Sequence, residues 1–82
     1  MSNKFKLSSK NLNRFAIIGL NIAYYRKKNK LTQEELADIV GISRVHLSKI
    51  EAPNIDSSIS LVTLFDIADA LEIPPAKLLE ER

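Results

Sequence analysis

The stretch from Thr32 to Glu51 constrains the fold more than any other part of this chain. Thr32 precedes Glu35 by three residues, and this spacing lets each side chain accept a hydrogen bond from a free backbone amide at a helix start. Gly41 then supplies a residue that tolerates the left-handed backbone found after a helix end. Ser43 is a good N-cap for a second helix. The stretch therefore predicts two short helices joined by a tight turn.

Apolar side chains within this stretch recur at helical spacing, which indicates the buried faces. Leu36 and Val40 share one face of the first helix, while Leu47 and Ile50 share one face of the second. Ala37 suits a close crossing of the two helices, because a larger side chain would push them apart. The expected core residues here are Leu31, Leu36, Ala37, Val40, Ile42, Leu47 and Ile50.

Three further helices are expected around this pair. The first starts near Asn11 or Asn13 and ends near Lys28 or Asn29, and another runs from Ser60 to about Glu72. Pro74 and Pro75 then end one helix and begin a last short one, since proline suits a first helical turn. The core-facing stripes are Phe15, Ile18, Ile22 and Tyr25 in the first helix, and Leu61, Leu64, Ala68 and Leu71 in the later one.

Taken together, the segments 18–31, 32–51, 60–61 and 67–71 resemble the Cro/C1-type, or Xre, family of helix-turn-helix DNA-binding domains. These domains are five-helix relatives of the lambda and 434 repressors. The resemblance implies an all-α, five-helix, lambda repressor-like fold that covers nearly the whole chain.

A domain organisation follows from this resemblance. Residues 1–10 are expected to form a short, flexible basic arm, with pairing to a partner chain as a strand as the alternative. Residues 11–82 are expected to form the helix-turn-helix domain, with its motif at residues 32–51.

Composition narrows the function classes. Eighty-two residues make one domain at most. The absence of cysteine excludes disulfides and thiolate metal sites, and a single histidine cannot form a metal site or a catalytic dyad with another. No phosphate-binding loop or nucleophile motif is present, so we expect no enzyme activity, cofactor, metal or small-molecule ligand. The apolar run at residues 15–25 is interrupted and too short to span a bilayer, which favours a cytoplasmic location without a membrane partner.

Charge is sorted along the chain although the net charge is only +2. Residues 1–30 carry eight basic and no acidic side chains, whereas residues 51–82 carry seven acids and two bases. This asymmetry favours a polyanion partner on one face. The alternative is a solvated charged surface with no partner.

The resemblance also implies which side chains read DNA bases. In this family the second helix of the motif, residues 43–51, lies in the major groove. Arg44 has the planar fork that reads guanine, and Val45 offers an apolar contact for a thymine methyl, with partial burial as the alternative. The positions that match the family's groove-facing residues are Ser43, Arg44, Val45, Ser48 and Lys49.

Other residues are expected to contact phosphates. Gln33 matches the family's glutamine at the first helix of the motif; the alternative is a plain polar residue at a helix start. The loop at residues 52–59 departs from the family, because it is longer and has no lysine or arginine. Its remaining candidates for phosphate contact are Asn54, Ser57 and backbone amides. The expected phosphate contacts are Gln33, Arg26, Lys27, Lys28, Lys30, His46 and Asn54.

The sequence thus predicts a sequence-specific regulator of transcription, expected to be a repressor, that binds double-stranded DNA at a palindromic operator. The alternative is a protein-interaction module, or antitoxin-like adaptor, that keeps this fold. A homodimer is expected, because one recognition helix reads few base pairs. Its expected surface is Val62, Phe65, Ile73, Leu78 and Leu79, with closure of the monomer core as the alternative for Phe65, Leu78 and Leu79.

Overall fold

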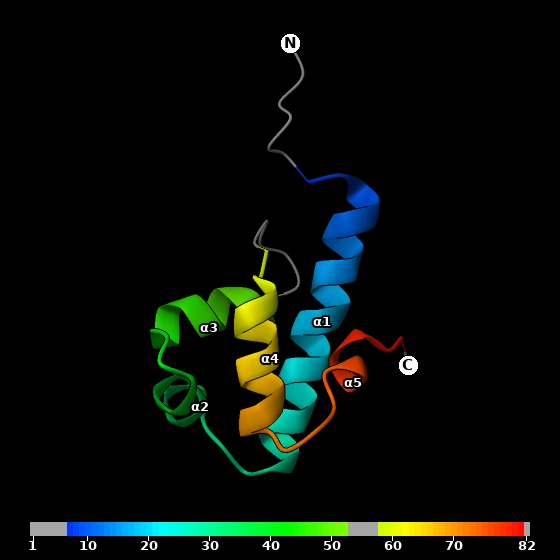
Figure 1. Cartoon of the computed structure of the whole chain (residues 1–82). Coiled ribbons are helices and arrows are strands. Elements are labelled where there is room, and N and C mark those ends of the chain that lie inside the picture. The colour runs from blue at the N-terminus through cyan, green and yellow to red at the C-terminus, as the bar shows by residue number, and fades with distance from the viewer. Residues whose placement is uncertain (1–6, 53–57, 82) are drawn as a thin grey trace.

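A computed structural model of the chain describes residues 7–52 and 58–81. In this part of the chain the protein is all-α and has five helices: α1 Ser9–Lys28, α2 Gln33–Val40, α3 Arg44–Glu51, α4 Leu61–Ala70 and α5 Ala76–Leu79. Figure 1 shows α1 as the long helix, with α3 and α5 packed against it, while α2 packs against α3, with which it forms the helix-turn-helix, and against α4. The predicted five-helix, lambda repressor-like fold is confirmed.

The first helix begins earlier than the sequence indicated. The hydroxyl of Ser8 accepts a hydrogen bond of 3.1 Å from the backbone amide of Asn11, so Ser8 is the N-cap and the helix starts at Ser9. The expected start near Asn11 or Asn13 was wrong because the first turn bears few core-facing side chains, and apolar periodicity does not reveal it. Residues 1–6 of the expected arm lie outside the described residues.

The predicted capping pattern of the motif is confirmed. The backbone amide of Glu35 donates to the Thr32 hydroxyl at 3.1 Å, and the amide of Thr32 donates to the Glu35 carboxylate at 2.8 Å. Gly41 has a φ of +86°, which lets the chain turn sharply after α2. The Ser43 hydroxyl accepts from the amide of His46 at 2.9 Å and starts α3. Local chemistry therefore fixes both ends of the turn.

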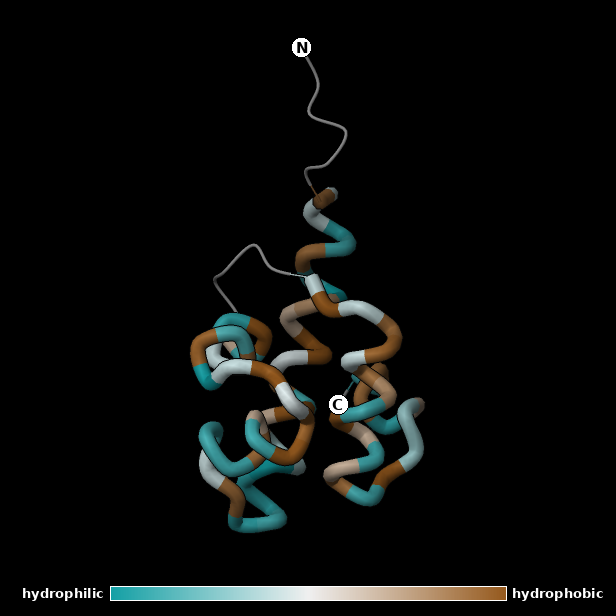
Figure 2. Tube along the Cα trace, turned by 60° about the vertical axis from the view of Figure 1, so that its left-hand side comes forward, coloured by the Kyte–Doolittle hydropathy of each residue, from teal (hydrophilic) through white to brown (hydrophobic). Residues whose placement is uncertain are grey.

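The hydrophobic core lies where the five helices meet, and Figure 2 shows apolar and polar segments alternating along the helices around it. Every core residue expected within the motif is buried or packs against the core. In the stripe expected along α4, Leu64, Ala68 and Leu71 are buried, but Leu61, at the start of the helix, is 68% exposed. The largest fully buried side chains among the described residues are Ile22, Leu36, Leu47, Ile67, Leu71 and Leu78.

None of the helices in the described part of the chain has the length and hydrophobicity needed to cross a lipid bilayer.

Candidate nucleic-acid interface

The outer face of α3 presents four side chains in one patch. Arg44, Val45 and Lys49 are exposed and Ser48 is partly exposed. Their spacing of i, i+1, i+4 and i+5 places them on one side of an α-helix. Val45 is 54% exposed, so more than half of its surface is open to solvent. We call these four residues the α3 outer face.

Ser43 and His46 lie at the edge of the α3 outer face. The oxygen of Ser43 is already an acceptor for the His46 amide, which leaves the hydroxyl hydrogen free to donate to another group. The His46 side chain is exposed next in sequence to Leu47, which is fully buried. Ser43 therefore combines a structural role with a position from which it can still reach a ligand.

Arg26 does not lie on the surface as predicted. Its side chain Nε donates to Glu51 Oε2 at 2.8 Å and its Nη2 donates to Oε1 at 3.0 Å. The third donor, Nη1, reaches the carbonyl of Leu31 at 2.8 Å, and Arg26 as a whole is only 8% exposed. The expectation that Arg26 contacts phosphate is wrong, because its guanidinium is buried and each of its three nitrogens donates a hydrogen bond within the monomer.

Gln33 joins this buried pair from α2. Its side-chain Nε2 donates to Glu51 Oε1 at 3.0 Å, so the carboxylate receives bonds from both α1 and α2. The amide nitrogen carries a second hydrogen that can still donate to a phosphate. We call Arg26 and Glu51, which are buried, together with the partly buried Gln33, the polar triad. It ties the last residue of α3 to the end of α1 and the start of α2.

A close approach of two backbones also positions α3. Gly19 in α1 is buried, and a Cβ atom there would collide with the carbonyl oxygen of Ile50 in α3. Only a residue without a side chain lets α1 and α3 come this near. Sequence analysis missed Gly19 and Glu51 as positioning residues; a glycine inside an apolar helical stripe was the available signal for the first.

Three exposed lysines lie where α1 ends and the chain turns towards α2. Lys27 and Lys28 are in the last turn of α1, and Lys30 follows it with a φ of +60°. The Nζ atom of Lys28 lies 5.9 Å from the ring centroid of Tyr24, a cation–π arrangement that leaves the lysine exposed. Asn54, the other expected phosphate contact, lies outside the described residues.

The expected dimerisation residues divide into exposed and buried ones. Val62, Phe65 and Leu79 are exposed. Leu78 is fully buried in the core, so its assignment to an outer surface was wrong, because the short α5 turns this side chain inward against α1. Ile73 is partly buried and packs against the same core.

Comparisons with known proteins match this geometry. The family model described as helix-turn-helix matches residues 22–78. The control protein C.SmaI of Serratia marcescens is 36% identical over 63 residues, which cover 77% of this chain and 73% of the relative.

Two solved structures share the fold. The restriction-modification controller protein C.AhdI from Aeromonas hydrophila superposes with a TM-score of 0.72 at 30% identity, covering 78% of this chain and 94% of that one. The hypothetical transcription factor NHTF from Neisseria superposes with a TM-score of 0.77 at 25% identity, covering 96% and 87%. The chain therefore belongs to the Xre-type helix-turn-helix family of DNA-binding transcription regulators.

Proposed function

We propose that this protein binds double-stranded DNA sequence-specifically through α3 and regulates transcription, acting as a repressor at its operator. The observation that carries the proposal is the α3 outer face, which presents Arg44, Val45 and Lys49 to solvent on a helix whose far side is locked into the core. A helix fits the major groove, where each base pair shows a distinct set of donors and acceptors.

The side chains of the α3 outer face have complementary chemistry for this task. Arg44 can donate two parallel hydrogen bonds to guanine, and Val45 can pack against a thymine methyl. Ser48 and Lys49 add donors one turn further along the helix.

The phosphate contacts come from the polar residues around α3. Lys27, Lys28 and Lys30 supply exposed positive charges at the end of α1, and the Gln33 amide has one hydrogen left to donate. Arg26 serves this surface indirectly, by holding the end of α3 through Glu51. Phosphate contacts set the register of the protein on DNA, whereas base contacts give specificity.

The identity of the relatives suggests which genes are regulated. C.SmaI is named a control protein and C.AhdI a restriction-modification controller. We propose the same role for this chain, control of the genes of a restriction-modification system. Its place of action is then the bacterial cytoplasm, where those genes are transcribed.

The proposed working form is a homodimer on a palindromic operator. A single α3 reads only a few base pairs, which is too little information for a unique site, and a two-fold dimer doubles it. Half-sites about 34 Å apart then place both recognition helices in successive major grooves. The exposed apolar residues Val62 and Phe65 on α4 and Leu79 at the end of α5 supply the contact surface.

Selection of binding sites from a random duplex library tests the proposal. We expect a convergent palindrome from the parent chain and none from a variant with Arg44→Ala and Lys49→Ala, which leaves the core untouched. Affinity for the selected site should also fall with salt, with a log–log slope of about −0.9 for each phosphate neutralised. A library without any convergent sequence and a slope near zero would instead favour a protein-interaction module built on the same fold.

A further inference from the structure

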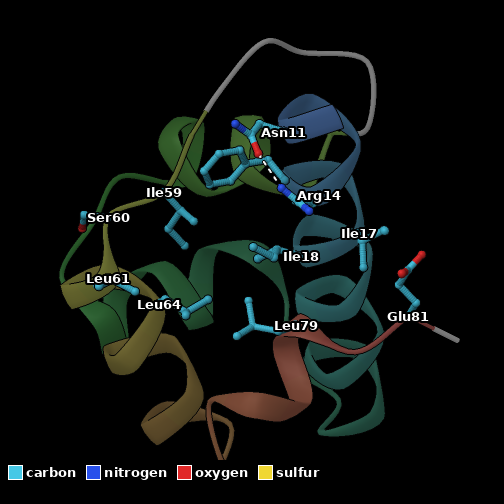
Figure 3. Close-up of a pocket in the computed structure, with 11 residues that line it drawn as sticks. Asn11, Arg14, Ile17, Ile18, Ile59, Ser60, Leu61, Leu64, Leu79 and Glu81 are labelled. Atoms are coloured by element: carbon cyan, nitrogen blue, oxygen red, sulfur yellow. Dashed lines mark hydrogen bonds between the residues drawn. The ribbon is translucent and has the colours of Figure 1, made fainter. Parts of the chain in front are cut away.

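A hollow opens on the side of the molecule where the first half of α1 faces the start of α4. Its volume is about 520 Å³. Figure 3 shows Leu79, from the end of α5, pointing into the space between Ile18 on α1 and Leu64 on α4. We call this space the α1–α4 groove. Its walls are mostly apolar, and exposed apolar residues continue beyond it along α4.

Asn21 is a buried polar residue in the middle of α1, and it contacts the opposite end of the chain. Its side-chain Nδ2 donates to the carbonyl oxygen of Leu78 at 2.9 Å and to that of Glu80 at 2.7 Å. The nitrogen of an asparagine amide carries two hydrogens, so one side chain can satisfy both carbonyls. Asn21 therefore clamps the backbone on both sides of Leu79.

The clamp is important because α5 has little intrinsic stability. The helix has four residues, and its N-cap, Pro75, makes no capping hydrogen bond with its side chain. So short a helix depends on tertiary contacts, since isolated short helices are marginal in water. Burial of Leu78 anchors one face of α5, and the Asn21 bonds fix how the backbone leaves it. The direction of the Leu79 side chain is set by these two anchors.

We propose that Asn21 is a positioning residue for self-association: it holds Leu79 at the α1–α4 groove, where a second copy of this chain docks. This inference rests on the proposed homodimer. It extends the contact surface from Val62 and Phe65 on α4 to a groove that α1 and the end of α5 complete.

The charges around the groove favour a second copy as the occupant. Arg14 lines it on the side of α1, and Glu81 lines it on the side of the C-terminal segment. In a two-fold interface the same patch faces itself in reverse, so the basic side of each copy meets the acidic side of the other. Such an arrangement is self-complementary around a shared apolar centre.

The test measures self-association without DNA, by sedimentation equilibrium of the full chain and of the variant Asn21→Leu. Leucine fills a similar space but cannot donate to either carbonyl. We expect Asn21→Leu to raise the dimer dissociation constant about tenfold or more. A second variant, Leu79→Ala, should raise it by a similar factor. A double variant with both Asn21→Leu and Leu79→Ala should dimerise as tightly as Leu79→Ala alone, because both changes remove the same contact.

Controls separate positioning from general stability. Leu36→Val alters a fully buried residue of α2, and we expect it to lower the melting temperature without changing dimer dissociation. If Asn21→Leu unfolds, Asn21→Ser replaces it, since its short hydroxyl cannot span both carbonyls. A further measurement needs no variant. When the parent chain is diluted so that the dimer dissociates, the methyl NMR signals of Leu79 should shift, because the side chain loses its partner.

Several outcomes would overturn the inference. A folded Asn21→Leu variant that dimerises normally would make Asn21 a purely structural residue. Additive effects of the two substitutions on the dimer dissociation constant would show that Asn21 does not act through Leu79. A parent chain that stays monomeric, with Leu79 methyl signals that do not change on dilution, would also contradict the inference. DNA binding is measured separately with the selected duplex, so loss of the dimer and loss of the proposed function are distinguishable.

Discussion

The guanidinium of Arg26 and the carboxylate of Glu51 form a two-point ion pair, with hydrogen bonds of 2.8 and 3.0 Å, between the end of α1 and the end of α3. The side chains are 10% and 5% exposed. Arg26 Nη1 also donates to the Leu31 carbonyl oxygen, and Glu51 Oε1 also accepts a hydrogen bond from the Gln33 side chain. The pair therefore fixes the C-terminal end of the recognition helix from inside the protein.

Breaking this pair on one side should be costly. Arg26→Met leaves the Glu51 carboxylate buried with Gln33 as its remaining side-chain donor, so we expect the free energy of unfolding to fall by about 3–5 kcal/mol in urea titrations. Lys27→Met is the matched control, because Lys27 is its exposed neighbour in α1, and it should change stability by less than about 0.5 kcal/mol.

Removing both charges should restore much of the lost stability, since an apolar pair needs no desolvation of ions. The variant Arg26→Met with Glu51→Leu tests this by the same titration. A double variant as unstable as Arg26→Met alone would show that hydrogen-bond geometry, rather than an uncompensated charge, makes the site essential.

The sequence predicted most of the fold because its signals are local. Thr32, Glu35, Gly41 and Ser43 each act within three or four residues, and each was confirmed. Helical periodicity likewise identified most of the core residues. The start of α1 escaped prediction because Ser8 caps a turn that has almost no buried face.

The site was less predictable because its key contacts are distant in sequence. Arg26 belongs to a basic run, and nothing local distinguishes it from Lys27, yet it pairs with a residue 25 positions away. Asn21 contacts carbonyls 57 and 59 positions away. The residues of the α3 outer face were predicted from the family resemblance, and the exposure of Arg44, Val45 and Lys49 agrees with a helix that buries its opposite side.

Gly19 offers a test of the contact between α1 and α3. Alanine normally stabilises a helix interior relative to glycine by about 1 kcal/mol. Here the added methyl would meet the Ile50 carbonyl, a backbone group that cannot rotate away, so we expect Gly19→Ala to lower stability by about 1–3 kcal/mol. Asn13→Ala, on the exposed side of α1, should be neutral or slightly stabilising in the same thermal melts. Equal melting temperatures for both variants would contradict the close approach.

Base reading and phosphate contact should separate in binding measurements. Arg44→Ala should weaken binding to the selected operator by about 1–3 kcal/mol and hardly affect random duplex, because it removes a base contact. Lys28→Ala should weaken both duplexes alike and reduce the salt slope by about one unit. Fluorescence anisotropy titrations at several salt concentrations measure both effects. Equal losses on both duplexes for Arg44→Ala would assign it to phosphate and move base reading to Val45, Ser48 or Lys49.

The dimer surface on α4 can be tested through Phe65, which is 47% exposed and lies on the same side of the helix as Leu61, one turn away. Phe65→Glu places a charge where a second copy would bury an apolar ring, so we expect a folded monomer. Its operator affinity should fall steeply, because each chain then binds a single half-site. Leu20→Glu is the control: Leu20 is 52% exposed on α1, and the variant should remain dimeric.

Sedimentation equilibrium gives the association state of both variants, and far-UV circular dichroism reports whether they are folded. An unfolded Phe65→Glu chain would indicate that the partly exposed ring supports the monomer core more than its exposure suggests. A folded dimer would place the partner contact elsewhere on the molecule. A parent chain that remains monomeric at tens of micromolar and binds one duplex per chain would rule out a homodimer as the form that reads the operator.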